Sequence, residues 1–509
     1  MAGLGARAAQ LLRYGGRRVA PDRWLAHWPY VAVTLVYAAS RLVYRFGLRV
    51  PFDYSPVYTF VQYLDPWFVE HDFWRSLLYL HQQAPLQNLL TGGCIRVFGT
   101  PAAFVVLDSI YVALGLATIL GMLHSMLRLG AARAIAAVFT AIYAASPVTV
   151  FYQSWLFYHA PVVALLTLSL VALLRYYRIG AFGAGLLFYG LFATASLFYA
   201  MLNPLLLVAV TLVLLVRPPS SDPRCKSPRA RMLLALCIPL CVLGLDKAKT
   251  QVLVGHSQGG ELLWVNLAVK TFYEMRPTDR DELVGRGLIP IVPQPAFLSI
   301  APSTYGALQI PHRSTGIPLL DMESTPDGEV NPHSLEIVLI AEKYYKEEAI
   351  ALLRLASDAY WRSVLRALTR DYFSSPLDYD PTIASANRDQ LRVLDRKVEA
   401  LLLADRDGTQ RLLWIALPAI LLYGIYRVLG ARAWLESERS TVAAISCLLV
   451  VITYVTLVTT FVSDGDFSRY RFNVDPFYVI LFGLMTTDLV RVVAGRWRRQ
   501  RDGSQPRAP

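Results

Sequence analysis

The stretch VPFDYSPVYTFVQYLDPWFVEHDFWRSLLYLHQQAPLQNLL, residues Val50–Leu90, lies between two long apolar runs at about 30–49 and 102–127. It mixes carboxylates, histidines and glutamines with many Phe, Tyr and Trp side chains. A polar, titratable segment attached directly to apolar runs is costly to keep at a membrane unless it handles a substrate. We therefore interpret it as the head of an active site at a membrane surface.

The composition of the whole chain excludes a soluble globular protein. Of its 509 residues, 55% are hydrophobic and only 17% are charged. A helix needs roughly 20 mainly apolar residues to cross a bilayer. The segment 85–98 contains Gln87 and Asn88 and is too short, so it is predicted to be re-entrant or interfacial. Ten runs are long enough, or nearly so, to be predicted spans: 30–49, 102–127, 131–150, 157–174, 180–197, 199–216, 231–246, 411–428, 440–462 and 474–493.

Clusters of Lys and Arg fall at alternate connections between these spans, which predicts the orientation of the chain. Short basic loops stay in the cytoplasm, so both termini are expected there. The net charge of +12 is then explained by cytoplasmic loops, and no nucleic-acid partner is implied. The short loops and the Arg, Ala and Leu content favour a bacterial plasma membrane. Four segments are predicted to meet on the extracytoplasmic side: 50–84, 151–156, 247–410 and 463–473.

The fold predicted by these observations is an all-α polytopic membrane protein with a partly helical exterior insertion. Within that insertion, two stretches after residue 335 have apolar residues at helical spacing, whereas 277–332 is rich in Pro, Ser, Thr and Gly. The predicted regions are a cytoplasmic N-terminus 1–29, a membrane region 30–246 with its exterior loop 50–84, the exterior insertion 247–410, a second membrane region 411–495, and a cytoplasmic tail 496–509.

One motif in the insertion favours a different chemistry. VLVGHSQGG (Val252–Gly260) contains G-x-S-x-G, the nucleophile elbow of α/β-hydrolases, with Ser257 in the nucleophile position. That elbow requires a buried strand before it and a helix after it in a doubly wound sheet. Here a membrane span precedes it and no alternation of strands and helices follows. We therefore interpret the match as fortuitous.

Four segments, in order along the chain, resemble the GT-C membrane glycosyltransferases, in particular the branch of protein mannosyltransferases and aminoarabinose transferases. The first is YLDP together with HDFWRSLLYLHQQAPLQNLL in the opening loop. The third segment, residues 248–271, resembles the family's K-N-x-x-x-F-G-x-x-x-x-S-S-W-x-x-x-N pattern, and this resemblance accounts for the hydrolase-like elbow. The other segments are PVTVFYQSWLFYHAP (147–161), AKTQVLVGHSQGGELLWVNLAVKT (248–271) and FSRYRFNVDPFYVIL (467–481).

The resemblance implies a GT-C-like fold and the transfer of a sugar from a polyprenyl-phosphate carrier to an acceptor hydroxyl on a lipid, glycan or protein. An acceptor hydroxyl needs a base to take its proton. The family's base is an acidic residue soon after the first span, which corresponds to Asp53 here. The alternative role for Asp53 is to cap a helix that begins near Ser55. Asp65 is the second candidate for the base, but it precedes Pro66 and is more typical of a turn or cap.

Further residues are candidates for binding the substrate. Arg469 and Arg471 would point to one side if their loop were extended, which suits a phosphate held by two guanidinium groups; snorkelling toward lipid headgroups is the alternative. No cofactor is certain, but Glu70 and Asp72 could hold a divalent cation such as Mg²⁺ or Mn²⁺, or simply begin a solvated helix. The remaining candidates are Tyr58, His81, Gln83, Lys270, with Lys249 as a secondary one, and Gln153, which stands where the family has Glu.

Two other classes of function compete with a glycosyltransferase. A lipid or sugar transporter usually has polar or broken helices at the membrane midplane in paired halves, and these spans are largely apolar without such pairing. A catalytically diverged membrane scaffold would fit the departures from the family pattern. Surface chemistry is favoured because the polar residues gather in the exterior loops.

Overall fold

The computed structural model describes residues 22–216, 218–219, 227–255, 260–294, 297–311, 314–377, 387–404, 409–430, 436–465 and 467–501. Throughout these ranges the regular structure is helical. Extended backbone pairs there only in isolated bridges, which join Asp53 to Trp155, Ser324 to Val330 and Ala404 to Gln410. The prediction of an all-α protein is confirmed.

Six of the helices are long and apolar enough to cross a membrane, and a seventh span is possible if a bent pair is counted as one. The pair consists of α8 (Arg133–Ala145) and α9 (Pro147–Gln153), which meet at an angle of 60°. Pro147 at the start of α9 has no N–H to continue α8. The six long helices are α7 (Thr100–Arg128), α10 (His159–Ile179), α13 (Pro228–Leu253), α21 (Arg411–Gly430), α22 (Glu436–Val462) and α24 (Asp475–Arg501).

The other three predicted spans are helices that do not meet this criterion of length and apolar character. They are α2 (Asp22–Leu42), which a π-helical turn extends to Gly47, α11 (Phe182–Phe198) and α12 (Pro204–Val216). The predicted span that corresponds to α12 began at residue 199, but residues 199–203 are not helical. Non-helical backbone at membrane depth is tolerated where it is buried in protein or lines a cavity. Tyr454 of α22 holds this turn by donating a hydrogen bond to the Met201 carbonyl at 3.0 Å.

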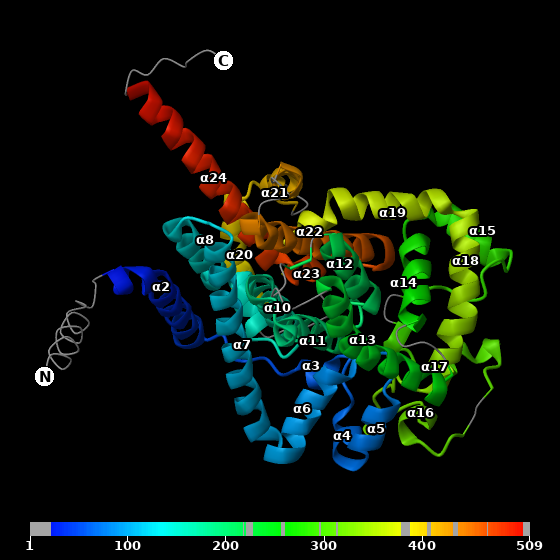
Figure 1. Ribbon diagram of the computed structural model, residues 1–509. Coiled ribbons are helices and arrows are strands. Elements are labelled where there is room, and N and C mark those ends of the chain that lie inside the picture. Colours follow the sequence, from blue (N-terminus) through cyan, green and yellow to red (C-terminus); the bar gives the residue numbers. More distant parts are fainter. Residues whose placement is uncertain are drawn as a thin grey trace, which may run out of the picture.

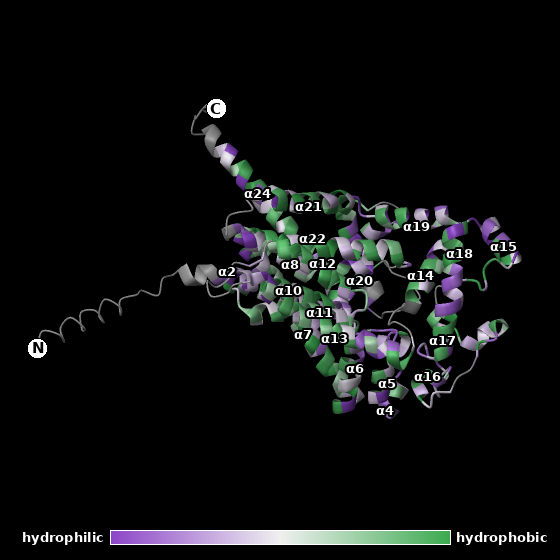
Figure 2. Ribbon diagram, turned by 45° about the vertical axis from the view of Figure 1, so that its right-hand side comes forward, coloured by the Kyte–Doolittle hydropathy of each residue, from purple (hydrophilic) through white to green (hydrophobic). Residues whose placement is uncertain are grey.

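The long apolar helices gather in the middle of the molecule and the polar ones at one side. In Figure 2 the hydrophobic residues concentrate on α8, α10, α11, α12 and α22, whereas α15 and α18 are largely hydrophilic. Figure 1 shows α2 and the end of α24 on the left and α14 to α18 on the right. This segregation matches a membrane region with a polar unit on one face.

The polar unit is built from the opening loop and the insertion after α13. Leu64, Phe68 and Phe73 of the opening loop share a buried cluster with Leu319 and Leu320 of the insertion. Both amphipathic stretches predicted after residue 335 are helical. The elements of the unit are α3 (Pro56–Thr59), α4 (Pro66–His71), α5 (Phe73–Tyr79), α6 (Pro85–Phe98), α14 (Gly260–Phe272), α15 (Pro277–Gly285), α16 (Pro318–Asp321), α17 (Leu335–Leu339), α18 (Lys346–Leu355), α19 (Ser357–Thr369) and α20 (Arg388–Leu401). The short helix α23 (Phe467–Phe472) lies between α22 and α24.

The region of the hydrolase-like motif is helical on both sides. Ser257 itself lies outside the described residues. The element before it is α13, which ends at Leu253, and the element after it is α14, which begins at Gly260. A nucleophile elbow needs a strand before the serine, and a membrane helix takes that place here.

Candidate functional site

The opening loop is joined to the segment 151–156, as was expected from their predicted placement on the same side of the membrane. The Asp53 N–H donates to the Ser154 carbonyl at 2.6 Å, and the Leu156 N–H donates to the Asp53 carbonyl at 2.8 Å. The Tyr63 hydroxyl donates to the Leu156 carbonyl at 2.6 Å. These bonds fix the residues that follow Leu156, which form a wall of the cavity described next.

A cavity of about 460 Å³ lies where the opening loop, the turn at 199–203 and the ends of α13, α14, α22 and α23 meet. Among the described residues, its polar lining consists of side-chain amides, tyrosines, one serine and one lysine. Its apolar lining comes largely from α22 and α14. The lining residues are Gln62, Gln82, Gln83, Tyr158, Tyr199, Ala200, Met201, Asn203, Lys247, Leu262, Leu263, Asn266, Tyr454, Val458, Val462, Ser463 and Tyr470.

Two amide oxygens in this lining are buried without a hydrogen-bond partner among the described residues. They are Oε1 of Gln62 and Oε1 of Gln82. The Gln82 side chain is fully buried and its Nε2 donates to the Pro332 carbonyl, which fixes the orientation of the amide. An unsatisfied buried acceptor costs about 1–3 kcal/mol. A ligand that brings hydroxyl groups into the cavity would remove this cost.

Tyrosines form one wall of the cavity. The rings of Tyr158 and Tyr199 stack with their centroids 4.3 Å apart, and Tyr470 continues the stack 6.1 Å from Tyr199. The Arg469 guanidinium lies 5.1 Å from the Tyr470 ring centroid and 5.7 Å from that of Phe157. Aromatic faces beside hydrogen-bonding amides suit a ligand that has both apolar C–H faces and hydroxyl groups.

The two predicted phosphate-binding arginines do not act as a pair in this structure. They lie on the helix α23 and not on an extended loop, and residues two apart on a helix do not face each other. Arg469 is directed toward Tyr470, whereas Arg471 donates to Asp475 at 3.2 Å and to the Tyr372 carbonyl. The prediction of a one-sided pair is wrong because α23 is helical.

Lys270 is buried beside the cavity and does not line it. Its Nζ donates to the Ser463 carbonyl at 3.1 Å and lies 4.7 Å from the Phe467 ring centroid. Burial lowers the pKa of Lys270 to about 8. Lys249, the secondary candidate, pairs with Asp246 at 3.1 Å. The cation that lines the cavity is their neighbour Lys247.

The histidine and glutamine candidates divide between several places. Gln83 lines the cavity. His81 is fully buried and its Nε2 lies 3.1 Å from the His333 carbonyl, so this nitrogen donates. Gln153 accepts a hydrogen bond from the Tyr37 hydroxyl at 3.3 Å, among the membrane helices.

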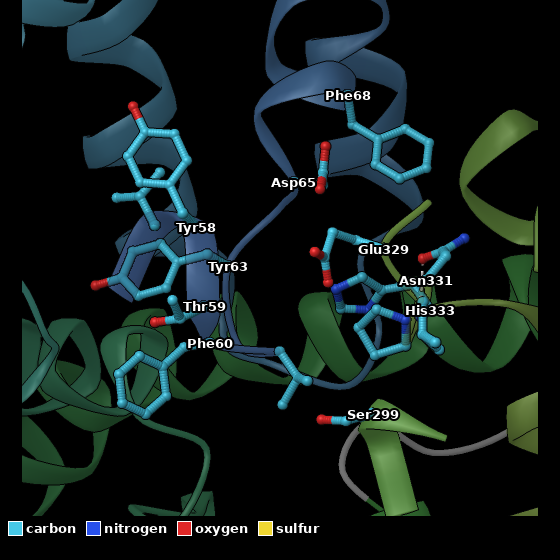
Figure 3. A pocket seen from close by; sticks show the side chains of 14 residues that line it. Tyr58, Thr59, Phe60, Tyr63, Asp65, Phe68, Ser299, Glu329, Asn331 and His333 are labelled. Carbon is cyan, nitrogen blue, oxygen red and sulfur yellow. Dashed lines mark hydrogen bonds between the residues drawn. The ribbon is translucent and has the colours of Figure 1, made fainter. Parts of the chain in front are cut away.

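A second, smaller pocket of about 100 Å³ lies between the opening loop and the insertion. Figure 3 shows Asp65, Glu329 and His333 around it, with Tyr58 and Tyr63 on the other side. Burial is the main cause that raises the pKa of Asp65, and the nearby Glu329 adds to it. Asp65 also caps α4 by accepting the Trp67 N–H at 2.8 Å, as a turn or cap residue was predicted to do.

The predicted metal site at Glu70 and Asp72 is not formed. Among the described residues, no three His, Cys, Asp or Glu side chains are placed to hold a metal ion. Glu70 is exposed on α4, and Asp72 stands at the break between α4 and α5. The helix ends between the two carboxylates, so they do not converge.

Asp53 is buried, with 6% of its surface exposed. Its Oδ1 accepts the Ser55 N–H at 3.0 Å at the start of α3, which is the capping role considered above. Asp53 is not among the described residues that line the 460 Å³ cavity. Its backbone is nevertheless bonded to the strand-like segment that leads directly into Phe157 and Tyr158.

Sequence reasoning missed most of the cavity lining. Tyr199 and Asn203 lie in the predicted span 199–216, where they were not named as candidates. Asn266 lies in the family-like segment 248–271, but it was not named as a site residue either. Lys247 directly follows the acidic end of a predicted span, and Gln62 lies in the opening loop. The available signal was the polar character of these positions at the ends of apolar runs.

The fold and the cavity together define a helical polytopic membrane protein with a polar cavity at one end of its helix bundle. No protein-family model matches the chain, and no curated protein matches it. A structural comparison finds similarity to a crystal structure of ArnT from Cupriavidus metallidurans in the apo state, which is 14% identical. The match covers 96% of this chain and 82% of that one, with a TM-score of 0.29. The function is therefore argued from the residues of this chain.

Proposed function

We propose that the protein is a membrane glycosyltransferase that moves a sugar from a polyprenyl-phosphate carrier to an acceptor hydroxyl on the extracytoplasmic face. The acceptor is a lipid, a glycan or a protein. The observation that carries the proposal is the 460 Å³ cavity, where the amide oxygens of Gln62 and Gln82 adjoin a tyrosine wall and have no hydrogen-bond partner in the described part of the chain. This combination suits a sugar better than an ion or a wholly apolar ligand.

The cavity also combines an apolar side with a positive charge, as a lipid-linked sugar phosphate requires. Val458 and Val462 belong to the spanning helix α22 and line one side, so a lipid chain can approach from the membrane. Lys247 supplies a positive charge for the carrier phosphate, and Arg469 lies behind Tyr470. Cationic groups stabilise the phosphate that departs with the carrier.

The reaction requires one base and one leaving group. The acceptor oxygen attacks the anomeric carbon, the bond from that carbon to the carrier phosphate oxygen breaks, and the carrier leaves as polyprenyl phosphate. The proton of the acceptor hydroxyl passes to a carboxylate, for which Asp53 is our candidate. Its backbone bonds to Ser154 and Leu156 hold it beside the segment that forms the cavity wall.

The test separates the two roles of Asp53, as base and as helix cap. In Asp53→Asn the amide oxygen still accepts the Ser55 N–H, but the side chain no longer takes a proton. Loss of a general base lowers the rate by about 10²–10⁴-fold. We expect that loss in a transfer assay on purified protein with a panel of polyprenyl-phosphate sugars, with thermal stability unchanged.

Asp65→Asn is the matched control, because Asp65 also accepts a backbone N–H at the start of a helix. This control is expected to retain activity. Unchanged turnover in Asp53→Asn would remove Asp53 as the base. Absence of turnover by the wild type with every donor would contradict the glycosyltransferase and favour a transporter or a diverged scaffold.

A further inference from the structure

Helix α19 carries exposed apolar residues as well as buried ones. One side packs into the molecule, where Ala359, Val364 and Ala367 are buried. Beside that side, Trp361 and Leu365 are 56% and 61% exposed, and Leu368 is half-buried. These last three residues are spaced at i, i+4 and i+7, so they lie along one face of the helix. We refer to Trp361, Leu365 and Leu368 as the exposed stripe.

The exposed stripe adjoins the end of α22, which is long and apolar enough to cross a membrane. Figure 1 shows α19 running from the end of α18 back toward α22. The Tyr360 hydroxyl donates to the Phe461 carbonyl at 3.1 Å, and the centroids of the Trp361 and Phe461 rings are 6.0 Å apart. Leu457 lies one turn before Phe461 on the same side of α22 and is 48% exposed. The surface that α22 presents to lipid therefore continues onto the exposed stripe.

The charged residues of α19 lie on a neighbouring side of the helix and are paired. Arg362 forms an ion pair with Asp358, and Arg366 forms ion pairs with Glu274 and, at 3.1 Å, with Asp371. These arginines are therefore compensated by carboxylates of the protein itself. A contact made by the exposed stripe does not require acidic lipid headgroups.

Two kinds of partner are usual for an exposed apolar surface, a membrane or another protein. Continuity with α22 selects the membrane, because Trp361 stands at the level where that span ends. Tryptophan is enriched at this depth of a bilayer, where its ring is apolar and its N–H meets polar groups. An amphipathic helix in this position lies in the plane of the interface with its apolar side about 5–10 Å into the boundary of headgroups and acyl chains.

We propose that α19 is an interfacial helix whose exposed stripe inserts into the lipid leaflet next to the polar unit. The bilayer surface then sets the height of the polar unit. Arg362 also donates to the Glu274 carbonyl at 3.1 Å, directly after the end of α14, and α14 contributes Asn266 to the 460 Å³ cavity. This inference does not depend on sugar transfer.

The test uses quenching of tryptophan fluorescence by brominated lipid. The full-length protein is placed in nanodiscs of phosphatidylcholine with or without bromine on the acyl chains. Because the chain has ten tryptophans, the emission of Trp361 is taken as the difference between the wild type and Trp361→Phe. We expect brominated lipid to reduce this difference by at least half. Trp264→Phe supplies the control difference, because Trp264 is half-buried against the core of the polar unit, and its emission should change little.

A second pair of variants tests the side of the helix without touching a buried residue. In the Trp361→Phe background, Leu365→Trp places a new indole on the exposed stripe, whereas Arg362→Trp places one on the charged side. We expect brominated lipid to quench the added emission of Leu365→Trp but not that of Arg362→Trp. Unquenched Trp361 emission, as a second copy of the chain covering the stripe would produce, overturns the proposal. Equal quenching of Trp361 and Trp264, or of the two added tryptophans, overturns it as well.

Discussion

The buried carboxyl group of Glu348 allows a quantitative test of how the helices of the polar unit are packed. Glu348 lies on α18, is fully buried, and neither carboxyl oxygen has a hydrogen-bond partner within the described part of the chain. Burial raises the pKa of Glu348 from its ordinary value of 4.5 to about 9. At pH 7 the folded protein therefore keeps this group protonated, whereas the unfolded chain ionises it.

The direction of the pH dependence follows from proton linkage. Between pH 4.5 and about 9 the folded state holds one more proton at Glu348 than the unfolded state does. The free energy of unfolding then falls by about 1.4 kcal/mol for each pH unit in this window. At pH 7 the accumulated cost is about 3 kcal/mol.

Glu348→Gln removes this cost because the amide has the same shape and does not titrate. The variant is expected to melt at a higher temperature than the wild type at pH 7, with a larger gain at pH 8.5 and almost none at pH 4.5. Thermal melting of the purified protein in detergent measures this difference. Glu347→Gln is the control, because its side chain is exposed on the same helix. A gain that does not grow with pH, or an equal gain in the control, would refute the buried carboxyl as the cause.

Two other substitutions test the cavity and the helix packing. Lys247→Met should raise the KM for the lipid-linked donor by about tenfold or more, because a hydrogen bond to a charged group is lost. Steady-state kinetics measures this change. Lys249→Met is the control and should leave the KM unchanged, because Lys249 lies beside the cavity but does not line it. Gly115→Ala brings a methyl group too close to the Gln153 amide oxygen, and overpacking of this kind costs about 1–3 kcal/mol. Thermal melting should show that loss in Gly115→Ala but not in Gly190→Ala, where the added methyl group meets no atom within 4 Å.

The membrane region could be predicted well from sequence because hydropathy is a property of each segment by itself. Every one of the ten predicted spans is a helix or a bent pair, although three are short or insufficiently apolar. The start of α12 was missed because residues 199–203 belong to a cavity. Their conformation depends on partners such as Tyr454, which lies about 250 positions later in the chain.

The candidate site was predicted less completely because its geometry is set by contacts between distant segments. The joining of Asp53 to residues 154–156 was expected from topology and is present. The arginine pair required an extended loop, and a single helical turn places Arg469 and Arg471 on different sides. The metal site failed for a similar local reason, since a helix ends between Glu70 and Asp72.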